Sequence, residues 1–216
     1  MAKPHRSSNV LKQNILDVAE RFFKEHGYDK TTFQMIADEL GISKGTITYH
    51  FKHKYLILYD YFQKFNNALI QYMNDNPPDN LNQYLMYCIH AQSFFREIIK
   101  KERSRELFFQ EEQFEYWFTG QQSAHESMYR LISNDFHKDL SDEDILAAAM
   151  MTKGAVKCLF DFFNKGDYIT GEKFCYQLIY MVGILSRLDE SMIQRNIQRT
   201  YEYVDSHDMP TISLLE

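Results

Sequence analysis

Seven consecutive residues near the start of the chain have the chemistry of a nucleic-acid contact. Lys44 supplies a cation for phosphate oxygens, and the following side chains supply hydroxyl, phenolic and imidazole groups that can bond to base edges. The aliphatic residue among them is Ile47. A helix that buries Ile47 leaves the other six off its buried face: Lys44, Gly45, Thr46, Thr48, Tyr49 and His50. With the free N–H groups at its start, such a helix is suited to enter a DNA major groove.

The preceding segments predict the helices that position these residues. The first should run from about Asn9 to His26, because apolar residues recur there at helical spacing, and Gly27 should end it. Thr31 or Thr32 should cap the second helix, and Gln34 would complete a capping box with Thr31.

A glycine-containing turn should join the second helix to the third. Gly41 can close the second helix in the left-handed conformation, and Ser43 can cap a short third helix that Ile47 and Phe51 hold to the core. Ala37 is small where the two helices must approach. Two helices joined by a three- to four-residue turn containing glycine form a helix-turn-helix. A helical hairpin that serves only as scaffold has the same pattern, so this alternative stays open.

Several short motifs follow one another between about Ile15 and Leu58: Arg21-Phe22-Phe23, Gly27-Tyr28, Thr31-Thr32, Ile36-Ala37, Gly41-Ile42-Ser43-Lys44-Gly45-Thr46 and Tyr49-His50-Phe51-Lys52-His53-Lys54. Together they closely resemble the N-terminal domain of the TetR/AcrR family of bacterial transcriptional regulators. The remaining three quarters of the chain has no such motif, as expected of a family whose effector domains diverge.

The resemblance implies a role for each matching residue. Base contacts would come from the second helix and the recognition helix, at Gln34, Lys44, Gly45, Tyr49 and His50. Phosphate contacts would come from Thr32, Thr46 and Lys54, with Ser43 capping the recognition helix. Thr48 departs from the family, which often has tyrosine at this position, and the shorter hydroxyl leaves one contact with the DNA backbone in question. As alternatives, Tyr49 and His50 could pack against the fourth helix, and Lys54 could be merely solvated.

The charge distribution favours a polyanion partner only for the N-terminal quarter. Residues 1–54 contain nine Lys or Arg against six Asp or Glu, whereas the remainder contains 15 against 24. No apolar leader or run of membrane-spanning length is present, so we expect a cytoplasmic protein with no membrane partner.

Catalytic and cofactor motifs are absent from the sequence. No Gly-rich phosphate loop, nucleophile elbow or HExxH helix occurs, and the eight histidines lack metal-ligand spacing. We therefore expect no enzyme activity, cofactor or metal. Cys88, Cys158 and Cys175 lack a CxxC spacing and are predicted to be buried thiols.

The distribution of proline predicts an all-α chain of nine or ten helices. The four prolines are at positions 4, 77, 78 and 210, and no stretch alternates with period two. We expect a three-helix helix-turn-helix DNA-binding domain over residues 1–53 and a larger helical effector-binding and dimerisation domain over residues 54–216. A fourth helix from about Lys54 to Asp75 should join them, and the resemblance makes it the mechanical link.

Aromatic residues are dense between Met86 and Met128, more than a narrow amphipathic stripe requires. An aromatic ligand pocket is one interpretation, with a carboxylate from Glu111, Glu112 or Glu115 for a cationic or hydrogen-bonding ligand. Its candidate residues are Phe94, Phe95, Phe109, Trp117, Phe118 and Met128. The alternative is a helix whose aromatics fill the core and whose glutamates are solvated.

Two later segments carry stripes that suit a two-fold dimer interface. In the helix predicted to begin at Ser141, with Asp144 in its cap, the stripe is Ala147, Met151, Gly154 and Cys158. In the next helix it is Phe174, Leu178, Met181 and Leu185. Such helices could form a four-helix dimer interface, although an intrachain bundle has the same pattern. A final helix over about Met192 to Tyr203 should precede a loose tail.

The sequence thus predicts a homodimeric, ligand-responsive repressor that reads a palindromic DNA operator and is released by an unidentified small-molecule effector. Two alternatives remain. One is an activator, or a partner-controlled regulator without a small ligand. The other is a helical adaptor that does not bind DNA.

Overall fold

The computed structural model describes residues 5–165 and 169–212, and all regular structure within these residues is helical. The eleven helices are α1 (His5–His26), α2 (Phe33–Leu40), α3 (Lys44–His50), α4 (Tyr55–Asp75), α5 (Gln83–Lys100), α6 (Glu102–Phe108), α7 (Glu111–Gly120), α8 (Gln122–Asp135), α9 (Asp142–Asn164), α10 (Gly171–Leu185) and α11 (Glu190–Ser206). The expected all-α class is confirmed. The number of helices exceeds the predicted nine or ten. No helix in the described part of the chain is long and apolar enough to cross a bilayer.

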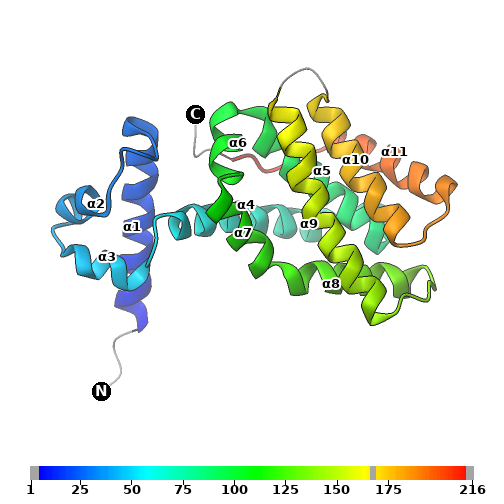
Figure 1. The fold of residues 1–216 in the computed structure, drawn as a ribbon, viewed down its shortest axis with the longest axis horizontal. Helices are drawn as coiled ribbons and strands as arrows, with labels where there is room; N and C mark the ends of the chain where they lie inside the picture. Colours follow the sequence, from blue (N-terminus) through cyan, green and yellow to red (C-terminus); the bar gives the residue numbers. More distant parts are fainter. Residues whose placement is uncertain (1–4, 166–168, 213–216) are drawn as a thin grey trace.

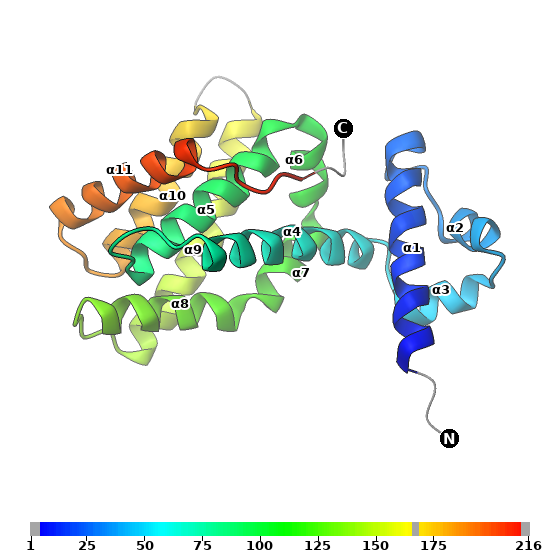
Figure 2. The same ribbon diagram turned by 180° about the vertical axis from the view of Figure 1, so that it is seen from behind.

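The three N-terminal helices form a unit at one end of the molecule. In Figures 1 and 2, α1 crosses the end of α4, and α2 and α3 lie on its far side, away from the larger domain. The side chains that hold this unit together are at most 2% exposed: Ile15, Ala19, Phe23, Ile36, Ala37, Ile47 and Phe51. The predicted inner faces of the three helices are therefore the buried ones.

The larger domain is built around α5, which packs against α4, α8, α10 and α11. The phenol of Tyr84 in α5 is fully buried and donates a hydrogen bond to the carbonyl of Ile179 in α10, at 2.7 Å. Gly183 lies in the same region, and a Cβ added to it would come within 2.7 Å of Tyr84 Oη and Ile193 Cγ1. Close approach of α5, α10 and α11 thus requires glycine at this position.

Local signals at several helix ends are as predicted. Gly27 and Gly41 have positive φ angles of 88° and 63°, and Ser141 forms a capping box with Asp144. The predicted capping box of the second helix is wrong. Thr32 is the cap, whereas Thr31 is buried and donates to the carbonyls of Phe22 and Gly27.

The C-terminal tail and one cysteine also differ from expectation. The segment after α11 runs back across the larger domain (Figure 2), and Ile212 is only 2% exposed, so the described tail is packed rather than loose. Residues 213–216 lie outside the described residues. Cys88 and Cys175 are buried, but Cys158 is exposed because it lies on the outer face of α9.

Candidate nucleic-acid interface and internal cavity

Short-range hydrogen bonds define the turn between α2 and α3. The amide of Ile42 donates to the carbonyl of Ala37 at 3.0 Å, across the left-handed Gly41. The hydroxyl of Ser43 accepts from the amide of Thr46 at 3.1 Å, so Ser43 caps α3 as predicted. With Ile47 fully buried, this cap sets which face of α3 points outward.

The outer face of α3 presents the residues that the sequence singled out. Tyr49 is 82% exposed, Lys44, Gly45 and Thr48 are exposed, and Thr46 and His50 are half-buried. The edge of the Tyr49 ring meets the His50 ring, with centroids 5.4 Å apart. The alternative that Tyr49 packs against the fourth helix is therefore wrong. In the described part of the chain Lys44 forms no ion pair, which leaves its ammonium available to a phosphate or base.

Four of the neighbouring polar side chains already form hydrogen bonds within the protein. Thr48 Oγ1 donates to the carbonyl of Lys44 at 3.0 Å, and the hydroxyls of Ser43 and Thr46 lie 2.9 Å apart. The amide of Gln34, on exposed α2, donates to Asp38 Oδ1 at 2.7 Å. A phosphate offers only acceptors, so the Thr48 hydroxyl would have to leave its carbonyl to reach one.

Lys54 requires a correction. Its ammonium donates to the carbonyls of Tyr28 at 2.6 Å and Thr31 at 3.1 Å, with Asp29 at 3.4 Å, and it lies 4.1 Å from the Tyr28 ring centroid. Burial lowers the pKa of Lys54. The half-buried ammonium directs its three donors at these carbonyls, so in this arrangement it is not turned toward an external phosphate. It fastens the loop between α1 and α2 to the start of α4.

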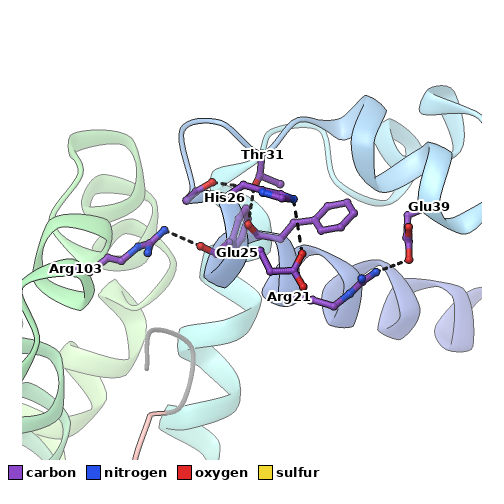
Figure 3. A network of polar contacts seen from close by, with 9 residues as sticks. Arg21, Glu25, His26, Thr31, Glu39 and Arg103 are labelled. Carbon is purple, nitrogen blue, oxygen red and sulfur yellow. Dashed lines mark hydrogen bonds and ion pairs between the residues drawn. The ribbon is translucent and has the colours of Figure 1, made fainter.

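A second cation connects the N-terminal unit to the larger domain. Arg103 extends from α6 toward the end of α1, where its Nη2 donates to the carbonyl of Phe23 at 2.6 Å (Figure 3). The same carbonyl also accepts from the amide of Gly27 at 3.1 Å, and the partial negative charge at the C-terminal end of a helix suits the added guanidinium. In the same view Arg21 of α1 pairs with Glu39 of α2, an exposed contact within the N-terminal unit.

The larger domain contains a cavity of about 430 Å³ between α4, α5, α7, α8 and α9. Five of the six predicted pocket residues line it: Phe94, Phe95, Trp117, Phe118 and Met128. Ile70 of α4 and Leu131 of α8 also line it and are 44% and 50% exposed, which places the opening between these helices. The volume and the largely apolar lining are those of a small-molecule site.

Two parts of the pocket prediction are wrong. Phe109 does not line the cavity, because its ring stacks on Phe160 with centroids 3.4 Å apart. No glutamate is among the described residues that line the cavity either, and Glu115 instead forms an exposed ion pair with Lys153 at 2.6 Å. Glu112 and Glu115 are exposed whereas Trp117 and Phe118 are buried, as in the alternative of a solvated acidic face, and the side chain of Glu111 lies outside the described part of the structure.

Several polar residues line the cavity that the sequence did not single out, including Asn74, Gln83, Ser127 and Thr152. Asn66, His90, Gln121 and His125 line it, and burial lowers the pKa of both histidines, that of His90 to about 4. In the sequence both histidines follow aromatic and apolar neighbours at helical spacing, but nothing local indicates that they share one cavity.

The predicted dimer residues separate into two groups. Ala147, Met151, Gly154 and Cys158 are exposed along α9, as an interface requires. In α10, Phe174 and Leu178 are at most 1% exposed and belong to the core of the chain, so their assignment to an interface is wrong. Met181 and Leu185 are half-buried, and Ile184, which was not predicted, is 48% exposed beside them. The inner face of α10 packs against α5, and α9 lies beside α10 (Figure 1), so this face is not available to a second copy of the chain.

Comparison with known proteins places the N-terminal unit. Residues 15–59 match the family described as bacterial regulatory proteins, tetR family. The chain is 44% identical over 43 residues to an HTH-type transcriptional repressor of Mycobacterium tuberculosis, covering 20% of this chain and 23% of that protein. It is 28% identical over 109 residues to the HTH-type transcriptional regulator AcrR of Shigella flexneri, covering 49% of each. The chain thus spans no more than about half the length of these relatives.

Solved structures extend the likeness to the larger domain. RolR without ligand has a TM-score of 0.63 at 15% identity, over 93% of this chain and 100% of that one. SmeT, the repressor of the Stenotrophomonas maltophilia multidrug efflux pump SmeDEF, has a TM-score of 0.53 at 22% identity, over 80% and 88% of the two chains. At these identities the likeness shows a shared fold.

Proposed function

Because its N-terminal domain places this chain in the TetR family of bacterial regulatory proteins, we propose that it is a cytoplasmic DNA-binding transcriptional regulator. It acts as a homodimeric repressor that reads a palindromic operator and is released by a small molecule. The observation that carries the proposal is the outward face of α3, where Lys44, Tyr49 and His50 project from a buried, capped scaffold. Residues 1–53 form the DNA-binding domain, and residues 54–216 bind the effector and dimerise.

A dimer would set the distance between the two reading helices. Half-sites on one face of DNA lie about 34 to 36 Å apart, so the two α3 helices of a dimer must be about this far apart to enter successive major grooves. The proposed interface is the exposed face of α9, with Ala147, Met151, Gly154 and Cys158, extended by Met181, Ile184 and Leu185 of α10. Gly154 supports this assignment because, beyond its own stretch of helix, no described atom of the chain lies within 4 Å of a Cβ placed there, so its small size is not needed for the packing described within one chain.

An effector in the cavity would reach the DNA-binding domain by two routes. The helix that carries Asn66 at the cavity begins beside Lys54, which holds the loop between α1 and α2. Residues of α5 up to Phe95 line the cavity, and α5 is followed closely by α6. Arg103 of α6 donates to the carbonyl of Phe23 in α1. An effector that prefers the arrangement of these contacts found off DNA weakens operator binding, with a coupling of typically about 1 to 3 kcal/mol.

Selection of bound sequences from random duplex DNA tests the proposal. The wild type should enrich a palindrome, whereas a Lys44→Ala, Tyr49→Ala variant should bind the selected sequence about 100-fold more weakly, since each base contact contributes about 1 to 3 kcal/mol. Lys100→Ala is the matched control, because it removes an exposed cation from the larger domain. A folded wild type that enriches nothing at low salt would support the adaptor alternative.

A further inference from the structure

The described lining of the cavity between α4, α5, α7, α8 and α9 is polar in places but uncharged. None of its described lining residues is Asp, Glu, Lys or Arg. A second cavity, between α5, α10 and α11, differs in that Arg96, Glu97, Lys100, Glu172 and Asp205 line it. A charged ligand in the first cavity would lose its hydration without gaining a counter-charge, which is strongly unfavourable.

Aromatic rings form flat walls in this cavity. Phe94 stacks on Trp117 with centroids 5.3 Å apart and planes at 25°, and His125 stacks on Phe118 at 5.4 Å and 17°. His90 also stacks on Phe94, with centroids 5.9 Å apart and planes at 15°. Extended ring faces of this kind favour a planar aromatic guest, which gains from stacking as well as from burial.

The two histidines determine which hydrogen bonds a guest must make. His125 Nδ1 lies 2.9 Å from the carbonyl of Gln121, which can only accept, so Nδ1 carries the proton and Nε2 is an acceptor. His90 Nε2 lies 2.8 Å from Asn66 Oδ1, so the proton is on Nε2 and Nδ1 is the acceptor. Burial and the mutual proximity of the two rings lower the pKa of His90 and keep it uncharged. The described residues supply no donor to either accepting nitrogen.

We infer that the effector is an uncharged planar aromatic molecule bearing a hydroxyl donor, a phenol, whose O–H bonds to His90 or His125 between the ring walls. This inference rests on the proposed function, in which the cavity is the effector site. The rings of the cavity favour a flat apolar ligand, and the uncharged imidazoles favour a ligand with a hydrogen-bond donor. The absence of charged residues from the described lining disfavours ions.

Fluorescence of Trp117, the single tryptophan of the chain, reports occupancy directly. Four probes share one ring system: 2-naphthol, 2-methoxynaphthalene, 2-naphthoate and 2-naphthylmethylammonium. We expect 2-naphthol to bind at least about tenfold more tightly than its methyl ether, which cannot donate, and the two ions to bind more weakly still. Equal affinity of the naphthol and its ether, tighter binding of either ion, or no quenching by 2-naphthol up to its solubility limit would overturn the inference.

Paired variants assign the hydrogen bond. His125→Phe keeps a ring against Phe118 but has no acceptor, whereas His125→Gln keeps an acceptor near Nε2. His90→Phe and His90→Asn form the corresponding pair for Nδ1. At one of the two positions, the Phe variant should lose about tenfold in 2-naphthol affinity and little for the ether, and the amide variant should retain part of it. Near-ultraviolet circular dichroism shows whether each variant is folded. If all four bind 2-naphthol as the wild type does, the inference is wrong.

The same proteins distinguish this inference from the proposed function. If operator binding is present and the order of the probes is wrong, the ligand class fails while the regulator stands. If the probes bind in the expected order but no operator is selected, the cavity assignment stands and the DNA-binding function fails. Release of a selected operator by 2-naphthol, and not by 2-methoxynaphthalene at the same concentration, would support both.

Discussion

The helix-turn-helix unit and the larger helical domain each depend on a glycine, but for different reasons. Gly41 has a φ of 63°, and a Cβ added to it would meet nothing within 4 Å, so only its backbone conformation matters. Gly183 has no such backbone requirement, and its Cβ would come within 2.7 Å of Ile193 and Tyr84. The first unit is thus specified by local backbone chemistry, and the larger domain by contacts between helices distant in the chain.

Polar contacts show the same difference. In the N-terminal unit, Thr32 and Ser43 bond to amides three residues ahead. In the larger domain, the Asn82 amide donates to Asn196 Oδ1 at 2.9 Å, and the Tyr203 hydroxyl donates to the carbonyl of Asn76 at 2.6 Å. These bonds between residues distant in sequence form only after α11 has docked against the segment that joins α4 to α5.

The largest expected effect comes from Gly183→Ala. The added methyl group must displace Ile193 and the bonded Tyr84 hydroxyl, and overpacking of this kind should lower the free energy of unfolding by about 3 kcal/mol. Urea denaturation at a fixed protein concentration measures it. Gly45→Ala, measured without DNA, is the matched control, because a Cβ there makes only an ordinary contact of 3.6 Å with Ser43 Oγ and alanine at this helical position should raise the free energy by up to about 1 kcal/mol. Similar losses in the two variants would contradict the distinction.

An effect of similar size should appear as a pH dependence of the stability of the larger domain. Burial lowers the pKa of His90 to about 4 from 6.5, so as pH falls the unfolded chain takes up its proton first. The resulting loss of stability is absent above about pH 6.5 and reaches about 3 kcal/mol near pH 4.

Chemical denaturation of the wild type and His90→Asn at several pH values isolates this contribution, because the other titrating groups are shared. The wild type should lose about 3 kcal/mol more than the variant between about pH 7.5 and pH 4. His125 lies close to His90 and its pKa is also lowered, so His90→Asn combined with His125→Gln should flatten the curve further. Parallel curves for wild type and His90→Asn would count against an uncharged His90.

The link between the two regions should contribute less. Arg103→Ala removes the charged donor to the carbonyl of Phe23, and we expect the free energy of unfolding to fall by about 2 kcal/mol. Arg130→Ala is the control, because its ion pair with Asp142 is exposed and should contribute less than about 1 kcal/mol. Faster hydrogen exchange at the end of α1 in Arg103→Ala alone would locate the loss. Equal effects of the two substitutions would argue against a junction held by Arg103.

The smallest effect is expected at the turn of the helix-turn-helix. Gly41→Ala places a Cβ in the left-handed region without a clash, so the cost should be only about 1 kcal/mol. Gly41→Asn should cost less, because asparagine adopts this conformation more readily. Thermal unfolding of the three proteins measures the order, and a loss for alanine as large as that of Gly183→Ala would break the comparison.

The sequence by itself determined the all-α class, the helix end at Gly27, the left-handed turn at Gly41, the caps at Ser43 and Ser141, and the face of α3 that points outward. These features depend on residues within about four positions of one another, so the local sequence is sufficient to predict them.

Only the tertiary structure decided which side chains meet. It placed Lys54 on loop carbonyls, turned Phe109 away from the cavity, buried Phe174 and Leu178, and brought His90 and His125 together. Apolar periodicity marks one face of a helix as buried, but it does not say whether another helix of the chain, a second copy or a ligand covers that face. That choice depends on how helices distant in sequence pack, and no local pattern carries it.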